Sequence, residues 1–113
     1  MPQLTSLHQC IHVDKTNLVS LQKQSEKPIL VKFVAPHCAG CMTLKPLIEE
    51  LTKAHLEQLY LVEIDITEDP ELAIDLDVRS VPTVALFKGE EELGRLVGLQ
   101  PKKHYVNLVQ QAV

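Results

Sequence analysis

The chain has 113 residues, of which 45% are hydrophobic, and carries a formal net charge of -4 at pH 7. This length is enough for one domain with a hydrophobic core, so we expect residues 1–113 to form a single domain. The apolar share argues against disorder, and the acidic balance gives no reason to expect nucleic acid as a partner. Apolar runs are too short to cross a membrane, and the N-terminus lacks a signal-peptide pattern. We therefore expect a soluble, cytoplasmic protein that binds no membrane.

The first two thirds of the chain alternate between predicted strands and helices. A strand over residues 6–13 precedes a short helix that Asp14 or Thr16 would cap. The run ILVKFVA, residues 29–35, is β-branched and aromatic with one charge, the pattern of a central strand covered on both faces. A long helix with apolar residues at helical spacing should follow from Cys38. The run LYLVEIDI, residues 59–66, predicts the next strand.

The last third predicts a short helix, a hairpin and a final helix. Asp69 and Pro70 should open the short helix, because proline suits a first helical turn. Two apolar runs around Gly89, TVALFKG and EELGRLVG, predict an antiparallel hairpin. The final helix should start at Pro101, with Tyr105 on its apolar side. The order β-α-β-α-β-α-β-β-α predicts an α/β fold in which helices flank a mixed β-sheet.

Two of the three cysteines, Cys38 and Cys41, are separated by two residues in APHCAGC. A structural zinc site needs four ligands, and the remaining cysteine, Cys10, lies on a distant segment. A structural disulfide across so short a loop would restrict the unfolded chain little. A helix N-terminus after a buried strand favours the thiolate of Cys38, and Cys41 follows one turn later, placed to attack a mixed disulfide. We therefore interpret the two cysteines as a pair that exchanges disulfides.

Two other groups of polar residues could be taken for metal sites, but neither fits one well. His8, Cys10 and His12 alternate, so on a strand they share one face, but a fourth ligand is missing and such a trio is more often edge-strand filler. We expect no metal site, and we expect Cys10 to be a core residue that takes no part in turnover. An odd number of cysteines favours a reducing compartment. The acidic runs EDPE and GEEE are typical of solvated faces.

The sequence resembles the thioredoxin family from about Ile11 to the C-terminus. The resemblance rests on APHCAGC with Pro46 five residues after Cys41, on EIDITEDPELAIDLDVRSVPT, on LFKG, and on Gly98 in RLVGLQP. It is greatest to the thioredoxin domains that carry APxC and TLKP, including those fused to plant-type NADPH-dependent thioredoxin reductases. The resemblance implies the thioredoxin fold and a redox-active disulfide, Cys38–Cys41, that needs no other cofactor.

The same resemblance implies roles for individual residues. Cys38 would attack the substrate disulfide and Cys41 would resolve the product. Pro82 of SVPT would be a cis-proline facing the pair, although it could also simply begin a strand. The backbone of Val81 would pair with an extended substrate. Gly98 would let a protein substrate approach, unless it is an ordinary turn glycine.

The chain departs from the family at the reactive loop, where HCAGC stands in place of the common WCGPC. Ala39 and Gly40 lie between the cysteines, free the loop and leave more amides able to face a thiolate. His37 either stabilises the Cys38 thiolate when it is protonated or is a solvated loop residue with no role. We count these three residues among the candidate substrate-binding positions.

A second departure concerns two buried charges. Many thioredoxins have a buried aspartate six residues before the first cysteine and a lysine on the neighbouring strand, whereas Lys32 and Glu63 hold those positions here. Burying Lys32 alone would be costly, so we expect Glu63 to be its partner. Either Glu63 relays protons to Cys41, which makes both residues part of the catalytic site, or the two form a structural ion pair without a kinetic role.

The leading hypothesis is a monomeric thioredoxin-like reductase of protein disulfides. Its oxidised pair would be reduced by a separate flavin- or ferredoxin-linked thioredoxin reductase. Two alternatives stay open. One is a redox-sensing binding module whose output is partner affinity, and the other is a disulfide oxidase or isomerase.

Overall fold

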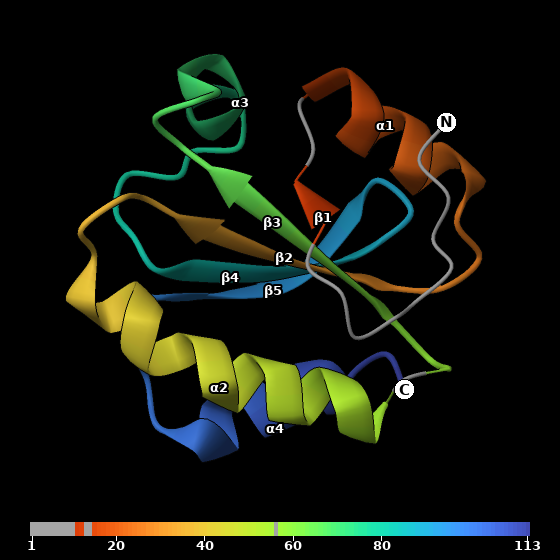
Figure 1. The fold of residues 1–113 in the computed structure, drawn as a ribbon. Coiled ribbons are helices and arrows are strands. Elements are labelled where there is room, and N and C mark those ends of the chain that lie inside the picture. Colours follow the sequence, from red (N-terminus) through yellow and green to blue (C-terminus); the bar gives the residue numbers. More distant parts are fainter. Residues whose placement is uncertain (1–10, 13–14, 56) are drawn as a thin grey trace.

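The computed structural model describes residues 11–12, 15–55 and 57–113 of the chain. These residues form strands and helices in the predicted order (Figure 1). The elements are β1 Ile11–His12, α1 Lys15–Gln24, β2 Ile29–Val34, α2 Ala39–Ala54, β3 Tyr60–Asp65, α3 Pro70–Asp75, β4 Thr83–Lys88, β5 Glu91–Val97 and α4 Lys102–Gln110. The predicted strand over residues 6–13 lies mostly outside the described residues, which include only β1 of it.

The described strands form one mixed sheet in the order β1-β3-β2-β4-β5. The central strand β2 runs parallel to β3 and antiparallel to β4. The β4–β5 hairpin turns at Gly89, which has a φ of 60°, and a register irregularity lies between Leu86 and Phe87. The mixed sheet that the sequence predicts is therefore confirmed, and the irregularity in β4 was not predicted.

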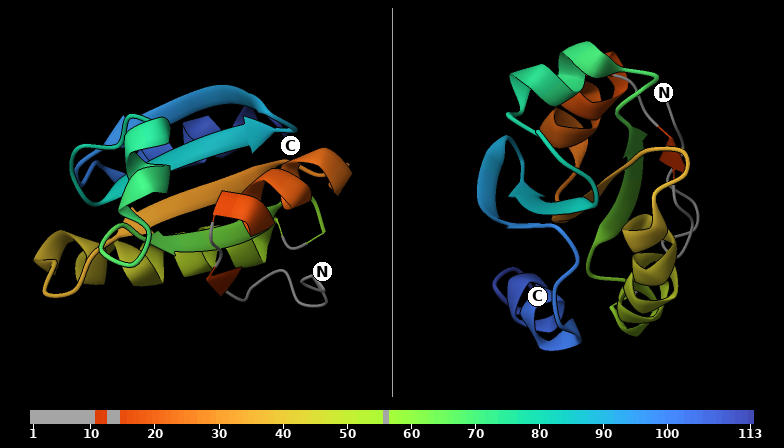
Figure 2. Two further views of the ribbon diagram at one scale, coloured as in Figure 1. Left: turned by 90° about the horizontal axis from the view of Figure 1, so that it is seen from above. Right: turned by 90° about the vertical axis from the view of Figure 1, so that its left-hand side faces the viewer.

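Helices cover both faces of the sheet. Helices α1 and α3 lie on one face and α2 and α4 on the other, as the right-hand view of Figure 2 shows. Side chains of β2 alternate between the two layers. Ile29, Val31 and Phe33 pack in the core with α1 and α3, whereas Leu30 packs with α2 and α4. The same alternation directs Lys32 to the α2 side, where it is only 1% exposed.

Helix α2 follows directly from the end of β2 and carries both cysteines of the motif. Cys38 is the N-cap residue, with extended backbone angles, so the helix begins one residue later than predicted. Pro46 lies inside the helix. The buried face of α2 consists of apolar residues at helical spacing, namely Leu44, Ile48 and Leu51. This packing fixes the helix N-terminus at the carboxyl end of β2.

Helix α3 begins at Pro70 as predicted, whereas α4 begins one residue after the predicted start at Pro101. The Asp69 carboxylate caps α3 by accepting a hydrogen bond of 3.1 Å from the Leu72 N–H, and Pro70 is the first helical residue. Helix α4 begins at Lys102, because Pro101 occupies the N-cap position and not the first turn. Both helices then turn apolar residues toward the sheet.

Candidate functional site

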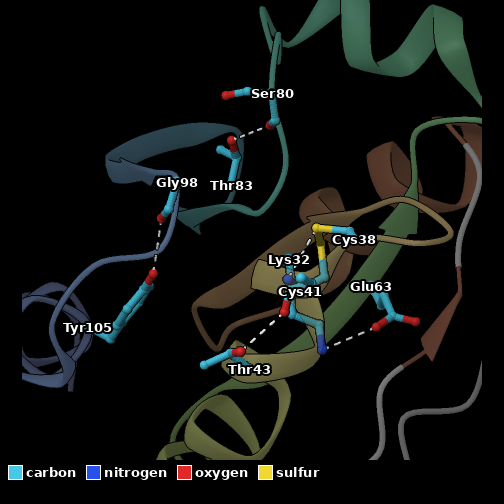
Figure 3. The surroundings of a disulfide bond; sticks show 10 residues. Lys32, Cys38, Cys41, Thr43, Glu63, Ser80, Thr83, Gly98 and Tyr105 are labelled. Atoms are coloured by element: carbon cyan, nitrogen blue, oxygen red, sulfur yellow. Dashed lines mark hydrogen bonds and ion pairs between the residues drawn. A yellow bond between two sulfur atoms is a disulfide. The ribbon is translucent and has the colours of Figure 1, made fainter.

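Cys38 and Cys41 form a disulfide at the N-terminus of α2, with their Cα atoms 5.2 Å apart (Figure 3). Cys38 is half-buried, whereas Cys41 is 8% exposed. The Cys41 N–H donates a hydrogen bond of 3.1 Å to Cys38 Sγ. A backbone N–H at a helix N-terminus stabilises negative charge on sulfur once the disulfide opens. Cys38, the more exposed of the two residues, is therefore also the one whose sulfur the helix N-terminus can stabilise as a thiolate.

Pro82 lies against residues 38–41, here called the CAGC loop, in which Cys38 caps α2 and the other three residues form its first turn. The Val81–Pro82 peptide is cis, as predicted from the family pattern. A Cβ added at Gly40 would lie 3.1 Å from Pro82 Cδ and 3.9 Å from Leu99 Cβ. Pro82 and Leu99, from separate parts of the chain, therefore both border the CAGC loop.

Gly98 follows β5 and is linked to the Pro82 segment. Its N–H donates a hydrogen bond of 2.8 Å to the Pro82 carbonyl oxygen. Gly98 has a φ of 75°, and apart from Gly98 and its two chain neighbours no described residue has an atom within 4 Å of the place where a Cβ would stand. The neighbouring Val97 and Leu99 are 52% and 48% exposed. The surface beside the CAGC loop is therefore open and apolar.

Lys32 and Glu63 lie below the disulfide on neighbouring strands. They are register partners on β2 and β3, and Lys32 Nζ lies 3.1 Å from Glu63 Oε1. Their side chains are 1% and 18% exposed. Both line an open cleft of about 170 Å³ that also borders Cys38 and Cys41. Figure 3 shows the ion pair alongside the disulfide. The expected pairing of the two charges is present, and it lies next to the reacting sulfurs.

The rim of this cleft includes His37. This residue is exposed and has a φ of 61°, a left-handed conformation that is uncommon outside glycine. Lys45 and Met42 line the cleft with it. Ala39 begins α2 beside Cys38 and is exposed. The predicted residues around the cysteines therefore gather at one end of the sheet, and Lys45 and Met42 join them.

Comparison with known proteins agrees with this arrangement. The family model described as Thioredoxin matches residues 9–111. The chain belongs to the thioredoxin family. It is 36% identical over 80 residues to the thioredoxin of Alicyclobacillus acidocaldarius, covering 71% of this chain and 76% of that one. A solved structure of a mutant thioredoxin from Halobacterium salinarum has a TM-score of 0.83 at 28% identity, with 97% of this chain and 96% of the other covered.

A much longer relative, named as a thioredoxin reductase, also matches. The chain is 33% identical over 99 residues to NADPH-dependent thioredoxin reductase 3 of Arabidopsis thaliana. The match covers 88% of this chain but 19% of that longer protein. The family and the cysteine pair together make this thioredoxin a thiol–disulfide oxidoreductase with protein disulfide reductase activity. Thioredoxins generally need no cofactor beyond the pair.

Two hydroxyl groups that the sequence did not single out hold the segments around the site. The Thr83 hydroxyl donates a 2.7 Å hydrogen bond to the Ser80 carbonyl, across the cis-proline (Figure 3). The Tyr105 hydroxyl donates a 3.2 Å hydrogen bond to the Gly98 carbonyl and accepts one of 3.0 Å from the Gln100 N–H. Helical periodicity marked Tyr105 only as an apolar-face residue, because its hydroxyl contact depends on the fold.

Burial and hydrogen bonding have opposite effects on Tyr105. Its side chain is 1% exposed. Burial raises the pKa of the Tyr105 hydroxyl above its usual value, and the hydrogen bond from the Gln100 N–H offsets part of that increase. The neutral phenol, which can both donate and accept, is therefore the form that the folded protein favours.

Several expectations concern residues that the structure does not describe. His8 and Cys10 lie outside the described residues, as does the His12 side chain, so their proposed roles remain predictions. Within residues 11–12, 15–55 and 57–113, no three histidine, cysteine or acidic side chains gather where they could hold a metal ion. No helix in the described part of the chain has the length and apolarity needed to cross a membrane.

Proposed function

We propose that this thioredoxin reduces target proteins by two successive exchanges, with Cys38 as the attacking and Cys41 as the resolving cysteine. The difference in exposure between the two cysteine residues carries this assignment. A target disulfide can reach Cys38 from solvent, whereas Cys41 can reach only a disulfide already formed on Cys38. The hydrogen bond from the Cys41 N–H to Cys38 Sγ supports the same order.

The exchange balances without an added cofactor. The Cys38 thiolate attacks one sulfur of the target disulfide, forms a mixed disulfide and releases the first target thiolate, which takes up a proton. Cys41 then loses its proton and attacks Cys38 Sγ, which releases the second target thiol. The target gains two electrons, and Cys38–Cys41 becomes the disulfide.

Protein substrates would dock on the surface around the CAGC loop. The backbone of Val81 would pair with an extended segment of the target. The open space at Gly98 would allow a close approach, and the missing side chain at Gly40 leaves room for Pro82 to lie beside the cysteine pair. His37 and Ala39, which flank Cys38 in the sequence and are exposed, would also border the bound segment.

Glu63 would accept the proton that Cys41 releases. Among the described residues that line the cleft, Glu63 is the one carboxylate, and both cysteines border the same space. The cleft volume of about 170 Å³ is large enough for water molecules that could bridge the two groups. Lys32, whose Nζ lies 3.1 Å from Glu63 Oε1, would hold the carboxylate in place.

A separate thioredoxin reductase would restore the dithiol. Similarity to part of an NADPH-dependent thioredoxin reductase makes a flavoprotein that uses NADPH the first partner to test, ahead of a ferredoxin-linked enzyme. Such a cycle requires a reducing compartment, so we place the protein in the cytoplasm, as a monomeric electron carrier.

The first test measures insulin reduction with NADPH and a flavoprotein thioredoxin reductase. The parental protein should turn over, and Cys38→Ser should abolish turnover. Cys41→Ser should accumulate a mixed disulfide that mass spectrometry locates at Cys38. Cys10→Ser is the matched control and should keep the parental rate. A mixed disulfide at Cys41 in the Cys38→Ser variant, formed as fast as the one at Cys38, would refute the order of attack.

The second test concerns proton transfer from Cys41. Glu63→Gln should keep the fold, slow resolution of a Cys38 mixed disulfide by about 10-fold to 100-fold, and remove one ionisation from the pH profile of that step. Glu50→Gln is the control, because Glu50 also pairs with a lysine, Lys102, but on an exposed surface. Resolution at the parental rate across the pH range would mean that Glu63 is only the counter-ion of Lys32.

A further inference from the structure

Four residues at the end of β5 and after it, numbered 97–100 and here called the docking loop, are held by a set of hydrogen bonds. The Gly98 N–H donates to the Pro82 carbonyl at 2.8 Å, and the Gln100 side-chain amide donates to the Val97 carbonyl at 2.8 Å. The Tyr105 hydroxyl bonds the Gly98 carbonyl at 3.2 Å and the Gln100 N–H at 3.0 Å. Tyr105 thus joins the backbone of the loop to α4 at two points.

Helix α4 makes one further polar contact with the loop. The His104 ring nitrogen Nδ1 lies 3.3 Å from Gln100 Oε1, so this contact joins two side chains that are only partly buried. Two flexible side chains restrain a backbone less than a buried group that bonds it directly. Tyr105 is therefore the α4 residue that can fix the path of the loop backbone.

The ring of Tyr105 is fixed independently of the loop. It lies on α4, is 1% exposed, and belongs to the core cluster that α2 and α4 form against the sheet. A tyrosine side chain has few rotatable bonds, so a packed ring directs its hydroxyl to one place. That place is beside the Gly98 carbonyl of the docking loop, as Figure 3 shows.

The docking loop borders the CAGC loop. Leu99 Cβ would lie 3.9 Å from a Cβ at Gly40, between the two cysteines. Val97 and Leu99 expose about half of their apolar side chains beside this contact. A shift of the loop by about an ångström would therefore change the surface that a bound protein meets next to Cys38.

We propose that Tyr105 is a positioning residue, which holds the docking loop in the conformation that receives protein substrates. This proposal rests on the proposed function, in which targets approach Cys38 over Gly98. The Tyr105 hydroxyl donates to one backbone group of the loop and accepts from another, so a single side chain fixes the loop at both Gly98 and Gln100. The substrate class affected is folded or extended protein, because a small disulfide needs only the Cys38 sulfur.

Removing the hydroxyl should affect protein substrates selectively. Tyr105→Phe deletes both hydrogen bonds and keeps the ring in the core, so the fold should persist. The docking loop would then sample other conformations, and part of the binding energy of a protein would be used to order it again. Loss of about one hydrogen bond's net contribution corresponds to a rise of about 3-fold to 10-fold in KM for the protein.

The experiment compares two substrates of the reduced protein. Insulin serves as the protein substrate, and 5,5′-dithiobis(2-nitrobenzoic acid) serves as the small disulfide. Tyr105→Phe should raise KM for insulin with kcat changed by less than about twofold, and should leave the rate with the small disulfide within about twofold of the parental rate. Tyr60→Phe is the matched control, because Tyr60 begins β3 and lies outside the docking loop. It should behave like the parental protein with both substrates.

Two other results of this comparison would refute the proposal. Equal losses with insulin and the small disulfide would show a general structural role for Tyr105, and an unchanged KM for insulin would show that the hydroxyl does not position the loop. Failure of the parental protein itself to reduce insulin would overturn the proposed function, and with it this inference.

A second variant tests the docking loop independently, in case Tyr105→Phe folds poorly. Gln100→Ala removes the side-chain contacts with the Val97 carbonyl and with His104 and leaves the core intact, so it should raise KM for insulin in the same direction by a smaller factor. Amide hydrogen exchange provides a direct readout: the Gln100 N–H should exchange faster in Tyr105→Phe. Parental exchange at Gln100 together with a parental KM in Gln100→Ala would overturn the proposal.

Discussion

Individual residues in this thioredoxin act through environments that differ over very short distances. Cys38 and Cys41 are three positions apart, yet one is half-buried and the other is 8% exposed. Lys32 and Glu63 are register partners at 3.1 Å, yet one is 1% and the other 18% exposed. Both side chains line the cleft that borders the cysteines, and Glu63 is the more exposed of the two.

Tyr105 gives a prediction about pH at the same scale. Its pKa is raised in the folded protein relative to about 10 in the unfolded chain. The folded state therefore keeps a proton that the unfolded state loses, so the stabilisation is fully present below about pH 10 and declines as the pH rises through the folded-state pKa.

Urea unfolding at several pH values would measure this effect. At about pH 8 the parental protein should exceed Tyr105→Phe in free energy of unfolding by about 1 kcal/mol, the net contribution of a hydrogen bond. The difference should shrink above about pH 10, because only the parental protein has a Tyr105 proton to lose. A difference that stays constant to about pH 11.5 would contradict the assignment.

Helices and strands are joined in part by side chains that reach across the chain. Arg95 on β5 donates hydrogen bonds of 2.8 Å and 3.1 Å to the carbonyls of Leu76 and Asp77, where α3 ends. Helix ends leave carbonyl groups without helical partners, and a guanidinium satisfies several at once. Glu92 holds the guanidinium from the other side, at 2.7 Å and 2.8 Å. Arg95 thereby links the end of α3 to the β4–β5 hairpin by hydrogen bonds.

Replacing Arg95 should loosen this connection. Arg95→Met should lower the free energy of unfolding by about 1–3 kcal/mol, the range for hydrogen bonds to a charged group. Arg79→Met is the control, since Arg79 pairs with Asp77 but is 87% exposed, and exposed ion pairs contribute little. Equal stability of the two variants in urea unfolding would show that Arg95 does not join α3 to the hairpin.

Local signals in the sequence predicted the helices, strands and turns well, but they did not predict most contacts between these elements. The cap at Asp69, the proline at Pro70 and the turn at Gly89 all act within a few residues, and each was found where expected. The bonds of Arg95 to Leu76 and Asp77 span 19 and 18 residues, and no periodicity in the sequence encodes them. The partner of Lys32 could be expected because a buried charge needs one, whereas the hydroxyl contact of Tyr105 gave no such signal.

At the scale of the whole molecule, the fold brings distant segments to one end of the sheet. The CAGC loop, the cis-proline and Gly98 lie far apart in the sequence and meet beside the disulfide. Family motifs allowed this meeting to be predicted, and the strand order β1-β3-β2-β4-β5 explains it, because β2 and β4 are neighbours and β5 follows β4.

The reduction potential of the Cys38–Cys41 couple tests the reductase assignment most directly. It can be obtained by equilibrating the protein with defined ratios of reduced and oxidised dithiothreitol and quantifying the thiols. A protein disulfide reductase should have a potential near the value of about -270 mV that thioredoxins show, and in any case more negative than about -220 mV. A potential more positive than about -220 mV, toward the value of about -120 mV of strong disulfide oxidants, would contradict it.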